Sequence, residues 1–311
     1  MSINMRELLI KSKTFGKKIR VLISIIYIEI NFSIILKLKI HKVSSMPKYI
    51  FAIFGDPVSH SKSPLMHNLA FQGLGYAGCY TRHLLEDGNK LKETFFNLGL
   101  KGINITIPHK EAAFNACDNL DPFAKKIGVV NTIVEQKGKL YGYNTDAPGF
   151  LKAISEFKNV KTVLFLGAGG TAQSTSSILR DEGYEVTLLN RSESRLEKYK
   201  ANGFETYTFK TFTPIAYDLI INMTSAGLED DNLPAPKEIL DALIPKTKAC
   251  VDVIYGKETP FLKLAKSYDK PTKDGSDMLL YQGIIAFEYF TNHAYTFNEI
   301  KPYMQRAFDF N

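Results

Sequence analysis

The sequence predicts an α/β protein with two domains, on three observations. Its 311 residues exceed the usual size of one domain, about 100–200 residues, and suffice for two hydrophobic cores. Short apolar runs bounded by Gly, Pro or Asn alternate with segments of helical periodicity, an order typical of α/β folds. One apolar run leads directly into Gly167-Ala-Gly-Gly-Thr-Ala172 and then into a helical pattern.

The first half of the chain is expected to form strands with a helix after the first of them. Tyr49–Phe54 is apolar and is closed by Gly55-Asp56-Pro57, which indicates a buried strand. Ser63-Pro64 opens a helical pattern, because proline is tolerated at the first helical position. Further strands are predicted at 101–107, 129–134 and 140–143.

The second half repeats the alternation of strands and helices. A strand is predicted at 161–166, and a helix runs from Thr171 to Glu182 and ends at Gly183. The other predicted elements are strands at 185–189, 218–222 and 249–253 and a largely helical stretch at 278–311.

The net charge of +7 does not indicate a nucleic-acid partner. Residues 1–45 carry nine of the 39 basic residues and two of the 32 acidic ones, which leaves 30 of each in residues 46–311. A nucleic-acid binder would show a basic patch in its folded part. We therefore expect no nucleic-acid partner and no membrane partner for the folded part.

Residues 1–45 differ in composition from the rest and contain no proline and one glycine. Their apolar run, 21–36, is broken by Glu29 and Asn31, which disfavours a membrane span, and no small-residue cleavage site follows it. Three interpretations stay open: an upstream extension with Met46 as the functional start, a weak membrane-surface anchor, or an added packed element.

The three cysteines, Cys79, Cys117 and Cys250, are odd in number and far apart. This argues against a disulfide framework and a cysteine zinc site, and predicts a cytoplasmic location. His60 and His67 are too few ligands for a metal, so none is expected.

The glycine-rich turn predicts a Rossmann-type dinucleotide-binding unit. Gly167, Gly169 and Ala172 match the pattern in which the first glycine turns, the second lets the pyrophosphate approach and the small residue packs helix on strand. The free N–H groups of the following helix favour phosphate.

The end of the next strand favours NADP over NAD. Asn190-Arg191-Ser192 and Arg195 stand where an acidic residue would bind the ribose 2′-hydroxyl of NAD. Guanidinium groups and a hydroxyl suit a 2′-phosphate instead. A solvated helix start is the alternative for the two arginines.

Polar residues cluster at predicted strand ends and turns of the first half. Asn104 and Thr106 are two apart on one strand and share a face, opposite Ile103, Ile105 and Ile107. Such a face builds a ligand site in an open α/β sheet, although a solvent-facing strand gives the same pattern. The remaining polar segments are Ser61-Lys62-Ser63, Lys110, Asn131-Thr132 and Asn144-Thr145-Asp146.

The chain resembles the shikimate dehydrogenase family through eight blocks in family order. These blocks are Phe54–Pro64, Gly102–Lys110, Val130-Asn-Thr132, Asn144-Thr-Asp146, Gly167–Gly170, Asn190-Arg191, Asn222–Ser225 and Tyr281-Gln-Gly283. One departure is Ala147-Pro148, where the family usually has glycine after the aspartate, and it predicts a stiffer loop.

The resemblance implies reversible NADP-dependent reduction of 3-dehydroshikimate to shikimate, in aromatic amino acid (chorismate) biosynthesis. It implies Lys110 and Asp146 as the catalytic pair, Ser61 and Ser63 as ligands of the substrate carboxylate, and hydrogen bonds from ring hydroxyls to Asn104, Thr106, Asn131 and Gln282. The implied cofactor residues are Gly167, Ala168, Gly169, Gly170, Thr171, Asn190, Arg191, Ser192, Arg195, Thr224, Tyr255, Gly275 and Met278.

The expected organisation is a substrate domain at 46–147, a Rossmann-type NADP domain at 148–277 and a helical segment at 278–311 that returns Gln282 to the substrate side. The site is expected in the cleft between the domains, in a monomer or homodimer. Two rival functions stay open: a quinate/shikimate dehydrogenase that uses NAD, and a non-catalytic NADP-binding sensor. Ser63, where quinate-preferring relatives often have threonine, argues against the first rival.

Overall fold

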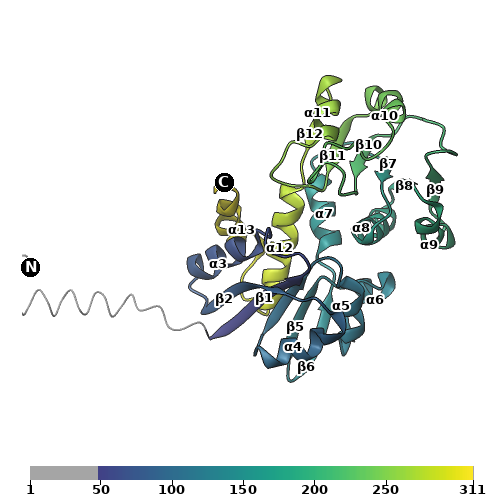
Figure 1. Cartoon of the computed structure of the whole chain (residues 1–311). Helices are drawn as coiled ribbons and strands as arrows, with labels where there is room; N and C mark the ends of the chain where they lie inside the picture. Colours follow the sequence, from purple (N-terminus) through teal and green to yellow (C-terminus); the bar gives the residue numbers. More distant parts are fainter. Residues whose placement is uncertain (1–47, 311) are drawn as a thin grey trace, which may run out of the picture. The chain divides into compact units, whose positions relative to one another are not determined.

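The computed structural model describes residues 48–310, and the expectations for residues 1–45 lie outside this range. Residues 49–310 contain two six-stranded sheets joined by helices (Figure 1). None of the helices in this range is long and apolar enough to cross a membrane.

The first sheet is mixed, and its strand order is β2-β1-β3-β5-β6-β4. The strands β1, β2 and β3 are parallel to one another, whereas β5 runs antiparallel to both β3 and β6. Its strands are β1 (Tyr49–Gly55), β2 (Gly78–Leu84), β3 (Gly102–Ile105), β4 (Asn119–Leu120), β5 (Thr132–Gln136) and β6 (Lys139–Tyr143). The accompanying helices are α3 (Ser63–Gly73), η2 (Gly88–Lys90), α4 (Leu91–Asn97), α5 (Lys110–Ala116) and α6 (Pro122–Ile127).

The second sheet is parallel throughout, with the order β12-β11-β10-β7-β8-β9. This is the doubly wound order of a Rossmann fold, which reverses direction between β7 and β10 and leaves a ligand crevice at that point. Its strands are β7 (Thr162–Leu166), β8 (Glu185–Asn190), β9 (Glu205–Thr208), β10 (Leu219–Asn222), β11 (Ala249–Asp252) and β12 (Thr272–Lys273). Its helices are α8 (Gly170–Asp181), η3 (Glu193–Arg195), α9 (Glu197–Ala201), α10 (Lys237–Leu243), η4 (Ile244–Lys246) and α11 (Pro260–Ser267).

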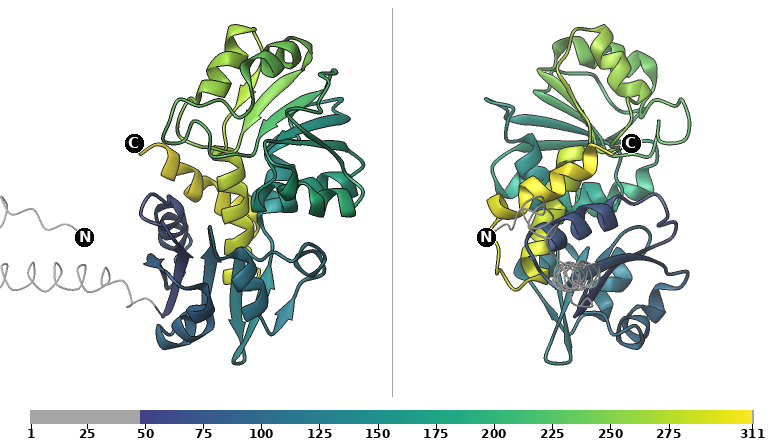
Figure 2. Two further views of the ribbon diagram at one scale, coloured as in Figure 1. Left: turned by 45° about the vertical axis from the view of Figure 1, so that its right-hand side comes forward. Right: turned by 90° about the vertical axis from the view of Figure 1, so that its left-hand side faces the viewer.

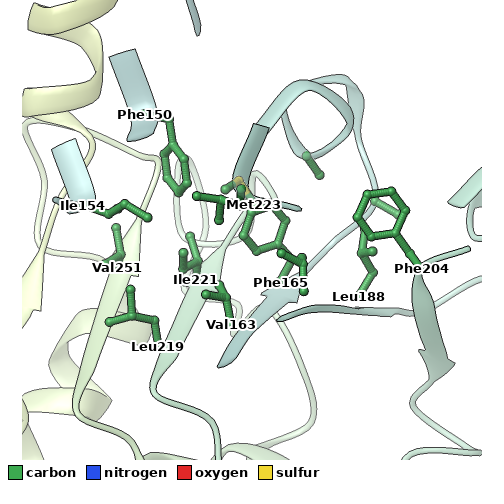
Figure 3. Packing of buried hydrophobic residues seen from close by; sticks show 14 of the residues in the cluster. Phe150, Ile154, Val163, Phe165, Leu188, Phe204, Leu219, Ile221, Met223 and Val251 are labelled. Atoms are coloured by element: carbon green, nitrogen blue, oxygen red, sulfur yellow. The ribbon is translucent and has the colours of Figure 1, made fainter. Parts of the chain in front are cut away.

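The apolar strands of the second sheet are buried on both faces, as expected when helices cover a parallel sheet. Figure 3 shows one face, on which Val163, Phe165 and Ile221 from neighbouring strands pack against Phe150. The two-domain α/β fold predicted from the sequence is confirmed.

Two helices connect the sheets. α7 (Asp146–Ile154) and α12 (Ser276–Phe290) lie side by side between the first and second sheets (Figures 1 and 2). After α12 come α13 (Phe297–Gln305) and η5 (Arg306–Phe308), so the predicted helical end of the chain is confirmed.

The last helices cover one face of the first sheet. Phe51 of β1 and Met66 and Phe71 of α3 form one buried cluster with Phe287 of α12 and Met304 of α13. The start and the end of the described chain therefore share one core.

Three local predictions were wrong. The strand predicted at 129–134 begins only at Thr132 and runs to Gln136. β3 ends at Ile105, two residues before the predicted end, because the Thr106 N–H bonds to the Phe54 carbonyl and the chain then turns toward α5; Ile107 is consequently 68% exposed instead of belonging to an apolar face. Ala147-Pro148 is not a loop but lies in the first turn of α7. Proline fits there because the first N–H groups of a helix have no partner within the helix.

We predict that Gly149→Ala weakens the packing of α7 on α12. A Cβ on Gly149 would lie 2.6 Å from the backbone nitrogen of Gln282, and a backbone atom gives way at higher cost than a side-chain end. Unfolding in urea should show a free energy of unfolding lower by about 1–3 kcal/mol, despite the better helix propensity of alanine.

Gly283→Ala is the matched control, because the one atom that its Cβ would approach too closely is the terminal methyl of Met66, at 2.7 Å. This flexible side chain can rotate away, so the change in unfolding free energy should stay within about 1 kcal/mol. Equal stability of Gly149→Ala and the wild type would contradict the proposed close packing.

Candidate active site

One cavity of about 310 Å³ lies between the first sheet and the second. It gathers all the residues predicted to bind substrate or transfer a proton, namely Ser61, Ser63, Asn104, Thr106, Lys110, Asn131, Asp146 and Gln282. Of the predicted cofactor residues it includes Gly170, Thr171, Tyr255, Gly275 and Met278. The others, Gly167, Ala168, Gly169, Asn190, Arg191, Ser192, Arg195 and Thr224, do not line this cavity.

The Lys110 ammonium and the Asp146 carboxylate form an ion pair, with Nζ 2.6 Å from Oδ2. Lys110 is the first residue of α5 and Asp146 the first residue of α7. The two side chains are only 18% and 10% exposed, so water screens the pair weakly. The start of α7 favours the carboxylate through the helix dipole.

Asn131 fixes the other oxygen of the carboxylate. Its Nδ2 donates to Asp146 Oδ1 at 2.8 Å and to Thr145 Oγ1 at 3.0 Å. The backbone N–H of Thr145 donates to Asn131 Oδ1 at 2.7 Å, which sets the orientation of the amide. Both Asp146 oxygens thus have partners before any ligand arrives, and the carboxylate is preorganised.

The loop with Ser61 and Ser63 is held by an arginine that the sequence analysis missed. Arg82 donates from Nε and Nη2 to the Ser61 carbonyl, at 3.2 and 2.5 Å. Ser61 Oγ accepts from the Ser63 N–H at 3.2 Å. Arg82 lies on β2, a strand for which no prediction was made; its alternation with Tyr80 would have been the available signal.

Tyr80 and His67 form a second layer behind the cavity. The Tyr80 hydroxyl donates to Asn104 Oδ1 at 2.7 Å, and the His67 ring stacks on Tyr80 with centroids 4.3 Å apart. His67 is fully buried, and neither ring nitrogen has a hydrogen-bond partner. Burial lowers the pKa of His67 to about 3, against a smaller opposing effect of the Asn104 side chain.

The glycine-rich turn has the shape needed for a dinucleotide. Gly167 has a φ of 112°, and a Cβ there would lie 2.7 Å from Thr224 Cγ2 at the end of β10. A Cβ on Gly169 or Gly170 would meet nothing within 4 Å, so the turn is open where a pyrophosphate would approach the start of α8. The residues present therefore fit a dinucleotide.

The strand end after β8 presents two exposed arginines. Asn190 Nδ2 donates to the Ser192 carbonyl at 2.9 Å, which shapes the turn. Arg191 and Arg195 are exposed and form no ion pair with the residues that the structure describes. Their guanidinium groups are thus available to an anionic ligand.

Tyr255 and Gly275 complete the wall of the cavity on the side of the second sheet. Burial raises the pKa of Tyr255, while the Lys62 backbone N–H and Arg82 oppose this effect. A Cβ on Gly275 would lie 2.1 Å from the Val253 carbonyl, so this position requires glycine for close packing. Within residues 48–310 no three His, Cys, Asp or Glu side chains are grouped to hold a metal ion.

The Rossmann-type sheet shares a cavity with the other α/β lobe, and a lysine and a carboxylate are paired in this cavity. This combination defines a dinucleotide-dependent dehydrogenase. A sequence model described as the shikimate dehydrogenase substrate binding domain matches residues 53–133. The NADP(+) shikimate dehydrogenase of Helicobacter hepaticus is 46% identical over 247 residues, which cover 79% of this chain and 92% of the relative. That of a Helicobacter pylori strain is 40% identical over 262 residues, covering 83% and 98%.

A solved structure has the same fold as this chain. The crystal structure of shikimate 5-dehydrogenase from Thermus thermophilus, in complex with NADP(H) and shikimate, superimposes with a TM-score of 0.72. It is 33% identical to this chain, of which 83% is covered, and 99% of that structure is covered. The chain belongs to the shikimate dehydrogenase family, as the eight sequence blocks predict.

We predict that His67 makes the protein sensitive to acid. Its pKa is about 3 in the folded state, against an ordinary value of 6.5, so the unfolded chain binds the proton first. Its contribution is complete above pH 6.5 and falls as the pH drops toward 3. Between pH 8 and pH 5 this single group should cost about 2 kcal/mol of unfolding free energy, measured in urea.

His67→Leu should reduce the loss of unfolding free energy between pH 8 and pH 5 by about 2 kcal/mol, whatever its effect on absolute stability. His60→Leu, which changes an exposed histidine, is the control and should keep the wild-type pH dependence. Identical pH dependence in the two variants would show that His67 is not the group responsible.

Proposed function

We propose that this protein catalyses the reversible NADP-dependent reduction of 3-dehydroshikimate to shikimate, a step of aromatic amino acid (chorismate) biosynthesis. The observation that carries the proposal is the Lys110–Asp146 pair, which lies in one cavity with the start of α8. The relatives named as NADP(+) shikimate dehydrogenases, together with the structure in complex with NADP(H) and shikimate, support it.

The substrate carboxylate is assigned to the hydroxyls of Ser61 and Ser63. Both residues are buried at the cavity and are neutral donors. Arg82 donates to the Ser61 carbonyl and thereby holds the loop in shape. The two serine hydroxyls are then available to bind the substrate carboxylate. The ring hydroxyls are assigned to Asn104, Thr106, Asn131 and Gln282, which line the same cavity.

Lys110 and Asp146 are assigned the proton transfer. Oxidation of an alcohol requires loss of its proton as the hydride leaves. Lys110 can relay this proton if its ammonium passes one proton to the Asp146 carboxylate while it takes the proton of the alcohol oxygen, so the pair ends as an ammonium and a carboxylic acid. In the reduction direction the Lys110 ammonium donates to the carbonyl oxygen, where negative charge develops. Asp146, held by Asn131, keeps the ammonium aligned.

The cofactor is assigned to the second sheet. The turn of Gly167, Ala168, Gly169, Gly170 and Thr171 would hold the pyrophosphate, and Asn190, Arg191, Ser192 and Arg195 would hold the 2′-phosphate. Tyr255 and Met278, which line the cavity, are assigned to the nicotinamide end, with Gly275 in the turn beside them and Thr224 next to the glycine-rich turn. NADP, when bound, supplies the carrier for the hydride.

We assign substrate binding to residues 46–147, NADP binding to 148–277 and the return of Gln282 to the segment 278–311. The match of the substrate binding domain to residues 53–133 supports the first assignment. A cytoplasmic location and a monomeric or homodimeric state stay predictions.

A steady-state assay tests the proposal against its rivals. The protein should oxidise shikimate with NADP, and should do so with a higher kcat/KM than with NAD or with quinate. Preference for NAD or quinate would favour the quinate/shikimate dehydrogenase. Binding of NADP without turnover of either acid would indicate a sensor.

We predict that Lys110→Ala lowers kcat by about 10²–10⁴, the usual effect of losing a general acid or base. The KM for NADP should change little, because the Lys110 ammonium bonds to Asp146 and not to the glycine-rich turn. Lys125→Ala, at an exposed position on α6, is the control with wild-type kcat. An unchanged kcat in Lys110→Ala would remove this residue from the mechanism.

We predict that replacing Arg191 and Arg195 together by alanine reduces the preference for NADP. The two guanidinium groups face solvent without acidic partners among the described residues, and charge-assisted bonds to phosphate contribute about 1.5–3 kcal/mol. The KM for NADP should rise at least tenfold, while the KM for NAD stays within about twofold. Equal increases for both cofactors would contradict recognition of the 2′-phosphate.

A further inference from the structure

Tyr80 is a buried polar residue to which the proposed mechanism gives no role. It lies on β2, is 2% exposed and packs its ring against His67. Its hydroxyl reaches across to β3 and donates to Asn104 Oδ1 at 2.7 Å. Burial raises the pKa of Tyr80, so the hydroxyl keeps its proton and stays a donor.

The orientation of the Asn104 amide follows from one partner with a fixed role. The Asn131 backbone carbonyl can only accept, and it lies 3.4 Å from Asn104 Nδ2. The second hydrogen of Nδ2 goes to Thr132 Oγ1 at 3.0 Å. Oδ1 is therefore the atom that faces the Tyr80 hydroxyl, because a flipped amide would place its oxygen against the carbonyl oxygen, two acceptors without a proton between them.

One hydrogen-bonding position of the Asn104 amide then remains. Both hydrogens of Nδ2 are used, and Oδ1 has accepted one bond from Tyr80. The Asn104 side chain lies near enough to His67 to oppose the effect of burial on its pKa, but neither ring nitrogen reaches hydrogen-bond geometry, so the second lone pair stays available. Asn104 lines the cavity, and all it can offer there is an acceptor.

We propose, resting on the function proposed above, that Tyr80 is a positioning residue that fixes Asn104 as an acceptor, so that the site selects a ring hydroxyl at this position. A ligand with a carbonyl there would place two acceptors together and leave both unpaired, which disfavours binding. Asn104 is therefore unsuited to bind the substrate oxygen that is a hydroxyl in shikimate and a carbonyl in 3-dehydroshikimate. That oxygen belongs beside the Lys110 ammonium, which is a donor.

The first test is Tyr80→Phe, which keeps the ring that stacks on His67 and removes only the hydroxyl. Loss of this bond leaves Asn104 Oδ1 without its donor, so that only the two bonds from Nδ2 hold the amide in place. Calorimetry on the NADPH-bound protein, in which shikimate cannot be oxidised, should show the Kd of shikimate raised about five- to tenfold, as for one hydrogen bond. The KM for NADP should stay within about twofold.

Tyr76→Phe is the matched control. Tyr76 packs in the same hydrophobic cluster, and its hydroxyl forms no bond to Asn104. Its Kd for shikimate should equal that of the wild type. A Kd within twofold of wild type for Tyr80→Phe would overturn the proposal.

A second test separates positioning of Asn104 from a general effect on structure. With three deoxy analogues of shikimate, each lacking one ring hydroxyl, the ratio of Kd between Tyr80→Phe and wild type should fall to about one for a single analogue and persist for the other two. In an Asn104→Ala background, Tyr80→Phe should add no further loss. An equal ratio for all three analogues, or full additivity of the two substitutions, would refute the role of Tyr80.

These outcomes are distinct from failure of the proposed function. A wild-type protein that does not oxidise shikimate with NADP contradicts the function itself. An active wild type with an unaffected Tyr80→Phe variant contradicts the role of Tyr80 alone.

Discussion

The ion pair between Lys110 and Asp146 is the interaction on which the rest of the site depends. Two charges removed from water are stable only when their remaining bonding positions are satisfied. Asn131, just before β5, provides this support for the carboxylate and is itself oriented by Thr145, just before α7. The first sheet must therefore bring the ends of β3, β5 and β6 together before the pair can form, which the antiparallel pairing of β5 with both neighbours achieves.

The sequence predicted the parts of the structure whose causes are local. The glycine-rich turn needs only a strand, an open turn and a helix that follow one another in the chain, so the sequence predicts all of it. Lys110 and Asp146 were found because their family blocks are short and contiguous. The end of β3 and the helical state of Pro148 were not, since each depends on a neighbour: the Thr106 N–H bonds to Phe54 on another strand, and α7 is held against α12.

Tyr80 and Arg82 were not predicted, and their roles also depend on distant partners. Tyr80 bonds to Asn104 and Arg82 to Ser61, and both partners are more than twenty residues away in the chain. Neither residue belongs to a motif, and a tyrosine or arginine on a strand has many ordinary uses. The register of β2 against β1 places both side chains next to their partners, and this register is known only from the three-dimensional structure.

The core shared by β1, α3, α12 and α13 has a consequence for how the protein is made. Phe51 and Met66 leave the ribosome long before Phe287 and Met304, the residues that cover them. The second sheet has all its strands by residue 273, so it can pack while synthesis continues. The first lobe keeps an apolar face uncovered until α12 and α13 have been synthesised, and during this interval the nascent chain is exposed to aggregation.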